Sequence, residues 1–430
     1  MGATLVRFAA LRHRDYAIYW ASQVVSRTGS EMRMVAFTWH VYLLTGSKIA
    51  LGLIGLCRSL PILIFGLWGG VTADRLDRRR VLIVTQAAMA LVSTTLFLIT
   101  RANLASPYLI YASVALIAAM AAFENPARAA FVVNVLPKED LENGLALGVL
   151  GFQVATVIGP AAGGLLLGAT SIQTLYLADA ISFLPLIGVL FLIRARKDDR
   201  SLAEAAGAVD PEKPPPEPPK SGFAAIADAV KYLRTKPVLL HLMWIDFLAT
   251  LFAGALLLLP VFSSEVFHQG ARGLGWLMSA PAVGAVIAGT VLSSRPPIRR
   301  HGRALLGAVV AYGIATALFG LTTSFWLGLV LLAASGAADT VSTVVRQIAR
   351  QTMIPDDMRG RLNAIHMLFF VSGPQLGELE AGALAELTSA RVSVVSGGLA
   401  CLVMGVVVAV ALPNVRELRV GAHEKTNAAG

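Results

Sequence analysis

Residues 70–80 read GVTADRLDRRR, a short turn that carries six charged side chains. It joins two apolar segments, 49–72 and 80–100, and each has roughly the 20 residues that an α-helix needs to cross a bilayer. A turn with this many charges does not belong in hydrocarbon. The stretch therefore predicts two membrane-spanning helices whose loop lies on the side of the membrane that collects positive charge.

The rest of the chain repeats this pattern. Of its 430 residues, 56% are hydrophobic and 14% are charged, whereas about 25% of the residues of a soluble globular protein are charged. The expected fold class is an all-α integral membrane protein with twelve transmembrane helices. The apolar segments that predict them lie at 16–44, 49–72, 80–100, 107–133, 144–168, 172–193, 238–262, 273–294, 304–323, 325–348, 362–388 and 392–412.

The positive charges indicate how these helices are oriented. If both termini are cytoplasmic, 29 of the 36 Lys and Arg residues fall on the cytoplasmic side, counting the arginines near the ends of segments four and ten with the loops that follow them. An excess of cytoplasmic Lys and Arg is typical of multi-pass membrane proteins. The net charge of +10 therefore reflects orientation in a lipid bilayer, and we expect no nucleic-acid partner.

Several classes of protein are disfavoured by what the sequence lacks. Cys57 and Cys401 lie singly in apolar segments, and the seven histidines form no HExxH pair. The P-loop pattern GxxxxGK(S/T) of ATP-driven transporters does not occur. We expect no metal, no cofactor and no enzymatic activity, while a membrane receptor or a channel stays open as an alternative.

The chain divides into two halves. Residues 197–222 carry six prolines among charged residues, which predicts a semi-rigid cytoplasmic linker. We expect six-helix bundles at 1–196 and 223–413 and a cytoplasmic tail at 414–430. Residues 223–235 have apolar side chains at helical spacing and predict either an interfacial helix or an extension of the seventh span.

The two halves also resemble each other. Three pairs of residues recur in the same order, at offsets of 220, 218 and 214 positions: Gly69 with Gly289, Pro137 with Pro355, and Gly159 with Gly373. A nearly constant offset indicates a duplication, which is a known transporter architecture.

The turn at 70–80 resembles the loop signature G-x-x-x-D-R-x-G-R-R/K of the major facilitator superfamily. The matching residues are Gly70, Asp74, Arg75, Arg78 and Arg79, while Asp77 stands where the family has glycine. The resemblance implies two six-helix pseudo-repeat bundles and a cytoplasmic gate at this loop. The alternative is a positively charged topological anchor.

The fifth segment contains a second motif. Residues 159–164 read GPAAGG, which is similar to the GPxxGG core of the superfamily's antiporter motif and matches it at Gly159, Pro160, Gly163 and Gly164. Proline kinks a helix and glycines allow close helix packing. The motif favours export over uptake, the alternative being an ordinary packing helix.

Further stretches resemble one branch of the superfamily. The sequence is similar to those of the drug:proton antiporter branch, which includes an enterobactin exporter and macrolide-efflux proteins. The similar stretches lie at residues 44–47, 123–128, 355–361 and 372–378. One departure is that the fourth segment has no arginine at mid-membrane, where many proton-coupled relatives have one.

Charged residues inside the apolar segments are candidates for substrate binding or proton coupling, because each costs about 2.5–3.5 kcal/mol or more at mid-bilayer. Arg27 and Glu31 are four residues apart and can pair on one helix face, so Glu31 is either a static ion-pair partner or a coupling group. Asp179 is expected to be structural. The candidates are Arg27, Glu31, Arg33, Arg58, Asp246, Asp339 and Glu378.

The distribution of these charges predicts the kind of substrate. The N-terminal half has an excess of arginines at membrane depth, and the C-terminal half is expected to hold acids without a buried Lys or Arg. We expect a secondary transporter in a bacterial cytoplasmic (inner) membrane that exports an amphipathic or partly anionic small molecule, such as a drug or siderophore, in exchange for protons. A monomer is sufficient for this activity. Uptake of a metabolite is the alternative within the superfamily.

Overall fold

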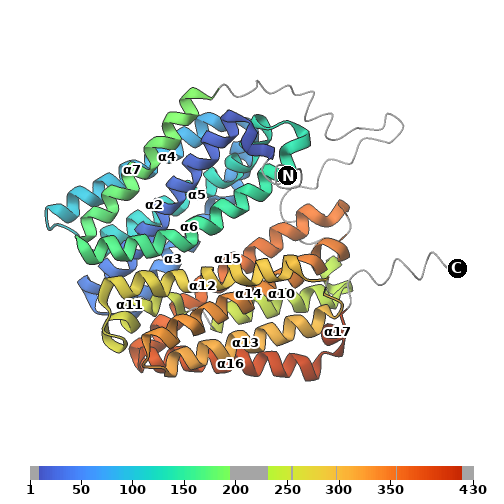
Figure 1. Cartoon of the computed structure of the whole chain (residues 1–430). Coiled ribbons are helices and arrows are strands. Elements are labelled where there is room, and N and C mark those ends of the chain that lie inside the picture. The colour runs from blue at the N-terminus through green and yellow to red at the C-terminus, as the bar shows by residue number, and fades with distance from the viewer. Residues whose placement is uncertain (1–8, 194–230, 253–254, 297, 355, 419–430) are drawn as a thin grey trace, which may run out of the picture.

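The computed structural model describes residues 9–193, 231–252, 255–296, 298–354 and 356–418. In this part of the chain the regular structure is helical and no strand occurs. Helices from the first half form one bundle and helices from the second half form another beside it (Figure 1). This confirms the all-α membrane fold. The linker at 197–222, residues 223–230 and residues 419–430 of the tail lie outside the described residues.

The N-terminal bundle contains six long helices. In chain order its elements are η1 (Ala9–Arg12), α2 (Arg14–Thr45), α3 (Lys48–Arg75), α4 (Arg78–Arg101), α5 (Pro107–Val135), η2 (Lys138–Asp140), α6 (Leu141–Ala169) and α7 (Ile172–Leu192).

The C-terminal bundle begins with an interrupted helix and continues with long ones. Its elements are α10 (Pro237–Phe252), η3 (Ala255–Leu258), α11 (Leu259–Val261), the π-helical turn η4 (Phe262–Val266), α12 (Gly270–Ser294), α13 (His301–Leu321), α14 (Phe325–Met353), α15 (Asp356–Leu387), α16 (Ala390–Ala411) and α17 (Pro413–Arg416).

Ten helical segments in the described residues are long and apolar enough to cross a membrane. Helices α2 and α15 have 32 residues each, which is about 48 Å at 1.5 Å per residue and more than a bilayer core requires. Both carry more charged side chains than the other long helices. With these two, the architecture agrees with the predicted twelve helices.

Serine side chains begin four of the long helices. Ser47, Ser106, Ser324 and Ser389 each accept a hydrogen bond from the backbone N–H three residues further on, at the start of α3, α5, α14 and α16. Such N-caps satisfy one of the amide groups that a helix leaves unpaired. They allow the chain to turn within a few residues and to re-enter the membrane.

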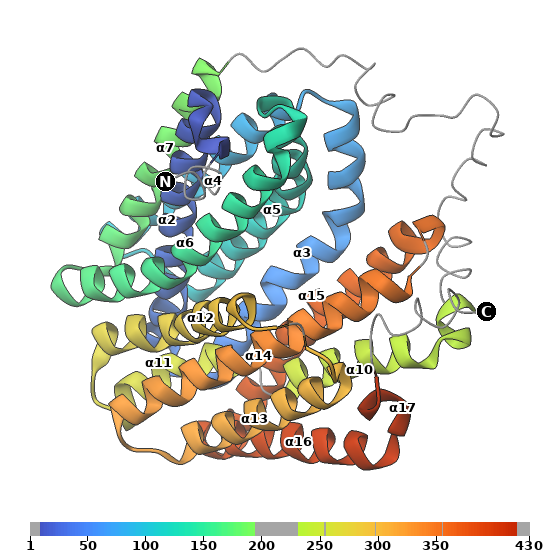
Figure 2. The same ribbon diagram turned by 45° about the vertical axis from the view of Figure 1, so that its right-hand side comes forward.

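The two bundles meet at one end of the molecule. This end, called the distal end here, holds the loops 102–106 and 322–324, and there α3 packs on α15 and α6 packs on α12. The opposite, proximal end holds η1, the C-terminal end of α7 and the short helix α17 (Figure 2). Toward the proximal end α3 and α15 diverge, as Figure 2 shows. The candidate site residues are distributed along the faces that the bundles turn toward each other and in the bundle interiors.

Candidate functional site

The glycines of the GPAAGG motif are the points where α6 comes closest to two other helices. A Cβ at Gly159 would lie 2.4 Å from the Cβ of Glu31 on α2, and one at Gly163 would lie 3.1 Å from the Cα of Met32. On the other side of α6, a Cβ at Gly164 would lie 2.6 Å from the Cα of Gly275 on α12. The motif thus packs α6 against its own bundle and against the opposite bundle.

Polar contacts add to the closure of the distal end. The carboxylate of Glu386, in the last turn of α15, accepts hydrogen bonds from the backbone amides of Lys48 (2.6 Å) and Ile49 (3.2 Å) at the start of α3. The hydroxyl of Tyr42 donates to Glu265 at 2.9 Å. Each of these contacts joins one bundle to the other. The carboxylate of Glu386 also lies where the positive end of the α3 dipole favours a negative charge.

Three of the predicted site residues lie near the contact between the bundles and interact electrostatically. Arg58 on α3 is close enough to interact electrostatically with Glu31 on α2 and with Glu378 on α15. Glu378 is buried, and its backbone and side chain contact α3 where Gly52 and Gly55 leave room. We call Glu31, Arg58 and Glu378 the inter-bundle charge set. Two of its members belong to one bundle and the third belongs to the other.

Arg33 lies apart from this set, in the interior of the N-terminal bundle. Its guanidinium forms a buried ion pair with Asp179 on α7, and Ser93 on α4 donates a second hydrogen bond to the same carboxylate. The guanidinium also lies over the rings of Phe37 and Phe183. These contacts tie three helices of one bundle together.

Arg27 does not form the ion pair that its spacing from Glu31 allows. Its guanidinium lies over the ring of Phe152 on α6, 5.4 Å from the ring centroid, and no ion pair between Arg27 and Glu31 occurs in the described structure. The two side chains still interact electrostatically. Of the two alternatives for Glu31, the static pair with Arg27 is therefore not formed, and Arg27 lies on an aromatic ring of α6 in its place.

A cavity of about 360 Å³, which we call the side pocket, opens between α2, α5 and α6. Its wall is mostly apolar, and its aromatic and polar side chains include Tyr19, Gln23, Arg27, Asn125, Arg128 and Phe152. Arg128 pairs with Glu124 one turn earlier on α5. The side-chain amide of Gln86 also donates to Glu124, at 2.7 Å. Glu124 is therefore held by two partners below the pocket wall.

Arg128 corrects the assignment made from sequence. It was counted with the cytoplasmic loop after segment four, but α5 continues to Val135, so Arg128 lies about two turns inside the helix. It faces a pocket in the bundle and not bulk solvent.

Arg346 corrects the expectation that the C-terminal half holds no buried cation. It is 9% exposed and forms an ion pair of 2.7 Å with Asp246 on α10 and one of 3.9 Å with Asp339 on its own helix. Ser342 and Thr343 accept further hydrogen bonds from its guanidinium. Asp246 and Asp339 thus share one arginine, so this bundle is better balanced in charge than the sequence indicated.

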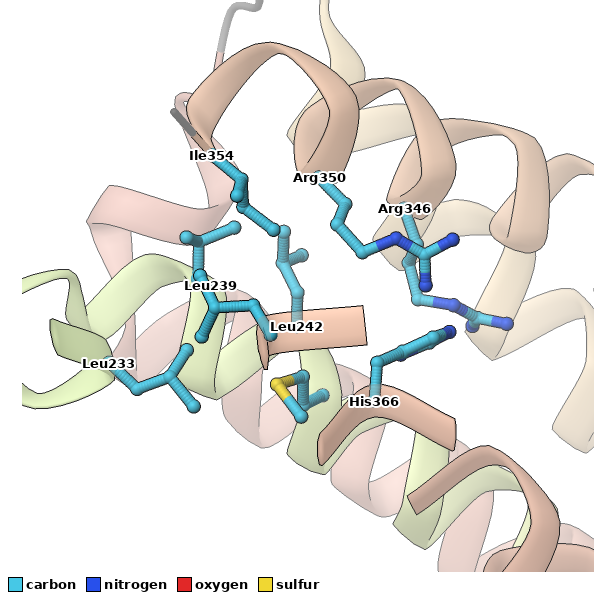
Figure 3. A pocket seen from close by; sticks show the side chains of 9 residues that line it. Leu233, Leu239, Leu242, Arg346, Arg350, Ile354 and His366 are labelled. Atoms are coloured by element: carbon cyan, nitrogen blue, oxygen red, sulfur yellow. The ribbon is translucent and has the colours of Figure 1, made fainter. Parts of the chain in front are cut away.

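A small cavity of about 30 Å³ lies beside this ion pair. Figure 3 shows Arg346 and Arg350 reaching toward His366, with Leu239 and Leu242 on the other side. A volume of this size holds about one water molecule. The cavity is too small for a substrate, but its polar side chains come from both α14 and α15.

The sequence contained a signal for both missed arginines. Arg128 and Arg346 are 218 positions apart, the same offset that separates Pro137 from Pro355. Two arginines at equivalent positions of a duplicated chain point to equivalent places in the two bundles. Their closeness to the ends of apolar segments hid this relation.

The structure describes only some of the side chains in the charged turn at 70–80. The side chains of Asp74 and Arg75 lie outside the described residues. Asp77, which replaces the family's glycine, caps α4 by accepting a hydrogen bond of 2.9 Å from the amide of Arg79. Arg78 donates to Asn134 near the end of α5, at 2.8 Å. Arg79 also donates to the backbone carbonyl of Phe191 on α7, at 2.9 Å. The turn therefore connects four helices at the proximal end.

No group of three or more His, Cys, Asp and Glu side chains that could hold a metal ion occurs in the part of the chain that the structure describes.

Comparison with known proteins gives one family and a consistent fold. The model of a family described as transmembrane secretion effector matches residues 5–429. The enterobactin exporter EntS of Shigella boydii is 26% identical over 399 residues, which cover 90% of this chain and 86% of that protein.

Solved structures share the fold at low sequence identity. A bacterial homologue of the human lysosomal transporter Spinster, in an inward-facing and unoccupied conformation, superposes with a TM-score of 0.68 and 14% identity over 94% of this chain and 96% of that one. A variant of the peptide transporter POT gives a TM-score of 0.71 and 14% identity, over 94% and 96% of the two chains.

Proposed function

The chain belongs to the transmembrane secretion effector family of major facilitator transporters, and from this premise we propose that it exports an amphipathic small molecule in exchange for protons. The two bundles would rock against each other and expose a site between them to one side of the membrane at a time. The proximal end, with its many arginines, would face the cytoplasm. The similarity of the chain to an enterobactin exporter supports export.

The observation that carries this proposal is the packing of α6. Through Gly159 and Gly163 it contacts α2, and through Gly164 it contacts α12 of the opposite bundle. At Gly164 and Gly275 backbone lies against backbone, so this contact between the bundles contains no interlocked side chains that must be withdrawn. A helix held in this way can pivot against its partner, which rocking requires.

The inter-bundle charge set is the proposed coupling device. A neighbouring cation favours the ionised form of a carboxylate. Opening of the distal end would take Glu378 away from Arg58, and the lone carboxylate would then accept a proton from the outer side. Closing would return it to Arg58 and favour release of the proton toward the cytoplasm. This order matches export driven by inward proton flow.

The driving force is sufficient. One proton that crosses a potential of 100 mV yields about 2.3 kcal/mol. At 1.4 kcal/mol for each factor of ten, this supports a roughly 40-fold accumulation of substrate.

Inside-out proteoliposomes provide the test. The vesicles would have an acidic lumen and be given an amphipathic fluorescent probe, either an anionic naphthalene sulfonate or the cation ethidium. Vesicles with the native protein should accumulate one of these probes, and a protonophore should abolish the accumulation. Glu378→Gln should retain exchange of probe at equal concentrations but lose accumulation driven by the proton gradient. Glu380→Gln, two residues away and exposed, is the matched control and should behave as the native protein.

Two outcomes would overturn the proposal. Accumulation that persists after the proton gradient has been dissipated would exclude proton coupling. Accumulation in right-side-out vesicles with an acidic exterior, and none in inside-out vesicles, would show uptake of a metabolite-like solute in place of export.

A further inference from the structure

The lining of the side pocket includes two positively charged side chains and no acidic one. Around it lie Arg27 and Arg128, and the acid beside it, Glu124, is already bound by Arg128 and Gln86. Glu31 interacts electrostatically with both Arg58 and Arg27. Arg27 and Arg128 line the pocket, whereas neither Glu124 nor Glu31 does.

Both arginines have donor groups without a protein partner. The Nε of Arg128 is buried and makes no hydrogen bond within the described residues. Arg27 has its face over Phe152, and no acceptor for its N–H groups occurs among the residues that the structure describes. Unpaired donors of a cation in an apolar bundle are costly. An anion in the pocket could accept hydrogen bonds from the guanidinium N–H groups that reach the cavity, in the bidentate manner that arginine favours, and would lie close to the buried charge of Arg128.

The rest of the pocket is suited to an aromatic group. Tyr19, Trp20 and Phe152 contribute rings to the wall, and the amide of Asn125 is exposed at the pocket. Aromatic rings pack favourably on other rings in offset or edge-to-face arrangements. The volume of about 360 Å³ lies within the range of small-molecule sites, roughly 300–1,000 Å³. It has room for one substituted ring with its acidic group.

We propose that the side pocket binds a planar aromatic ring bearing a carboxylate, held by Arg27 and Arg128 and stacked among the aromatic side chains. A carboxylate can interact with both arginines of the pocket lining, which includes no acid that would repel it. This inference rests on the proposed function, because it treats the pocket as part of the transport pathway. It specifies the chemical class of substrate, or part of a substrate, that the N-terminal bundle receives.

Trp20 in the pocket wall provides a direct measurement. The full chain in lipid nanodiscs would be titrated with 4-nitrobenzoate, which quenches tryptophan fluorescence, and with neutral 4-nitrobenzamide as its uncharged counterpart. The native protein should bind the acid at least about tenfold more tightly than the amide. Trp20→Phe should remove most of the quenching, while calorimetry still detects binding of the acid.

Variants that remove either a positive or a negative charge show whether binding depends on charge. Arg27→Gln, which breaks no ion pair, should weaken binding of 4-nitrobenzoate by about tenfold or more. Glu124→Gln removes an acid beside the pocket and should strengthen it. Arg101→Gln, on an exposed arginine at the far end of α4, is the matched control and should bind as the native protein. Thermal unfolding of each variant would show that the fold is intact.

Equal affinities of Arg27→Gln and Arg101→Gln for the acid, or equal affinities of the native protein for acid and amide, would overturn the inference. Because binding is measured without a gradient, its failure is separate from failure of the proposed function. Proton-driven accumulation of a probe without binding of 4-nitrobenzoate would refute this inference alone. Binding without proton-driven transport would refute the proposed function alone.

Discussion

Arg27 and Arg33 show how differently two arginines on one helix can be used. Both stand in the same apolar segment and were candidates for the same role. The structure places Arg27 in the side pocket and pairs Arg33 with Asp179, 146 positions further along the chain. Sequence spacing identifies partners on the same helix face, but a partner on another helix depends on the packing of the bundle. The structure therefore favours a transport role for Arg27 and a structural one for Arg33.

The Arg33–Asp179 pair leads to a prediction about stability. Asp179→Asn would leave a buried guanidinium without its counter-charge, and breaking such a pair from one side costs about 3–5 kcal/mol. We expect a large fall in the thermal unfolding temperature of the purified protein, measured by the fluorescence of its tryptophans.

A double variant separates structure from transport. Arg33→Met with Asp179→Leu replaces both charges with apolar groups and should recover most of the lost stability, together with transport. A double variant that is stable but transports nothing would contradict a purely structural pair and would place Arg33 in the mechanism.

At the level of single residues the sequence predicted part of the site. It identified Glu31, Arg58 and Glu378 because charges inside apolar segments stand out. It could not show that they meet, since Glu378 approaches Arg58 only where the two bundles pack. Arg128 and Arg346 were missed because they lie near the ends of their segments, where a cation is ordinarily read as part of a loop. Whether any of these residues moves a proton stays a prediction.

At the scale of helices, hydropathy predicted the number and approximate positions of the helices, but it misplaced the ends of some of them. The fourth and tenth segments extend to Val135 and Met353, beyond the ends expected at residues 133 and 348. The residues that extend the two helices, 134–135 and 349–353, include the polar side chains Asn134, Arg350, Gln351 and Thr352. A search for apolar residues does not detect helical turns of this composition.

The contact of α6 with α12 predicts the effect of a larger side chain. Gly164→Val would place a Cβ 2.6 Å from the Cα of Gly275, and backbone cannot yield as a flexible side chain can. The distal end should be held open and proton-driven transport should fall by at least about tenfold, measured in proteoliposomes. Gly188→Val, at a position on α7 with no atom within 4 Å of the added Cβ, is the control. Unimpaired transport by Gly164→Val would show that the contact is not part of the cycle.

The contact of α15 with α3 predicts a second effect on the distal end. Glu386→Lys would put a cation against the amides of Lys48 and Ile49 at the start of α3, where the helix dipole disfavours it. The distal end should open more often. A cysteine introduced at Gln375, buried at the contact with α3, should then react faster with a maleimide added from that side. Glu139→Lys, exposed at the proximal end, should leave the rate unchanged, and equal rates in both variants would refute the role of Glu386.

At the scale of the whole molecule, the arrangement is that of two bundles closed at the distal end and divergent at the proximal end (Figure 2). The internal repeats predicted two similar halves, and the twelve-helix architecture agrees with them. The sequence could not predict which end is closed, because the same residues must serve both the open and the closed arrangement. The division into linker and tail also stays a prediction.

The central claim is that protonation moves the two bundles between arrangements in which opposite ends are open. Spin-label distances test it most directly, in a variant that lacks Cys57 and Cys401 and sits in lipid nanodiscs. One pair of labels, at Leu104 and Leu387, spans the distal end, and a second pair, at Glu139 and Arg299, spans the proximal end; all four side chains are exposed. On acidification from about pH 8 to about pH 5, the distances between the distal labels should lengthen, while the distances between the proximal labels should shorten. The Glu378→Gln variant should show, at both pH values, the distances that the native protein shows at about pH 5. Distances that change in the same direction at both ends, or that do not respond to pH or to Glu378→Gln, would contradict the account.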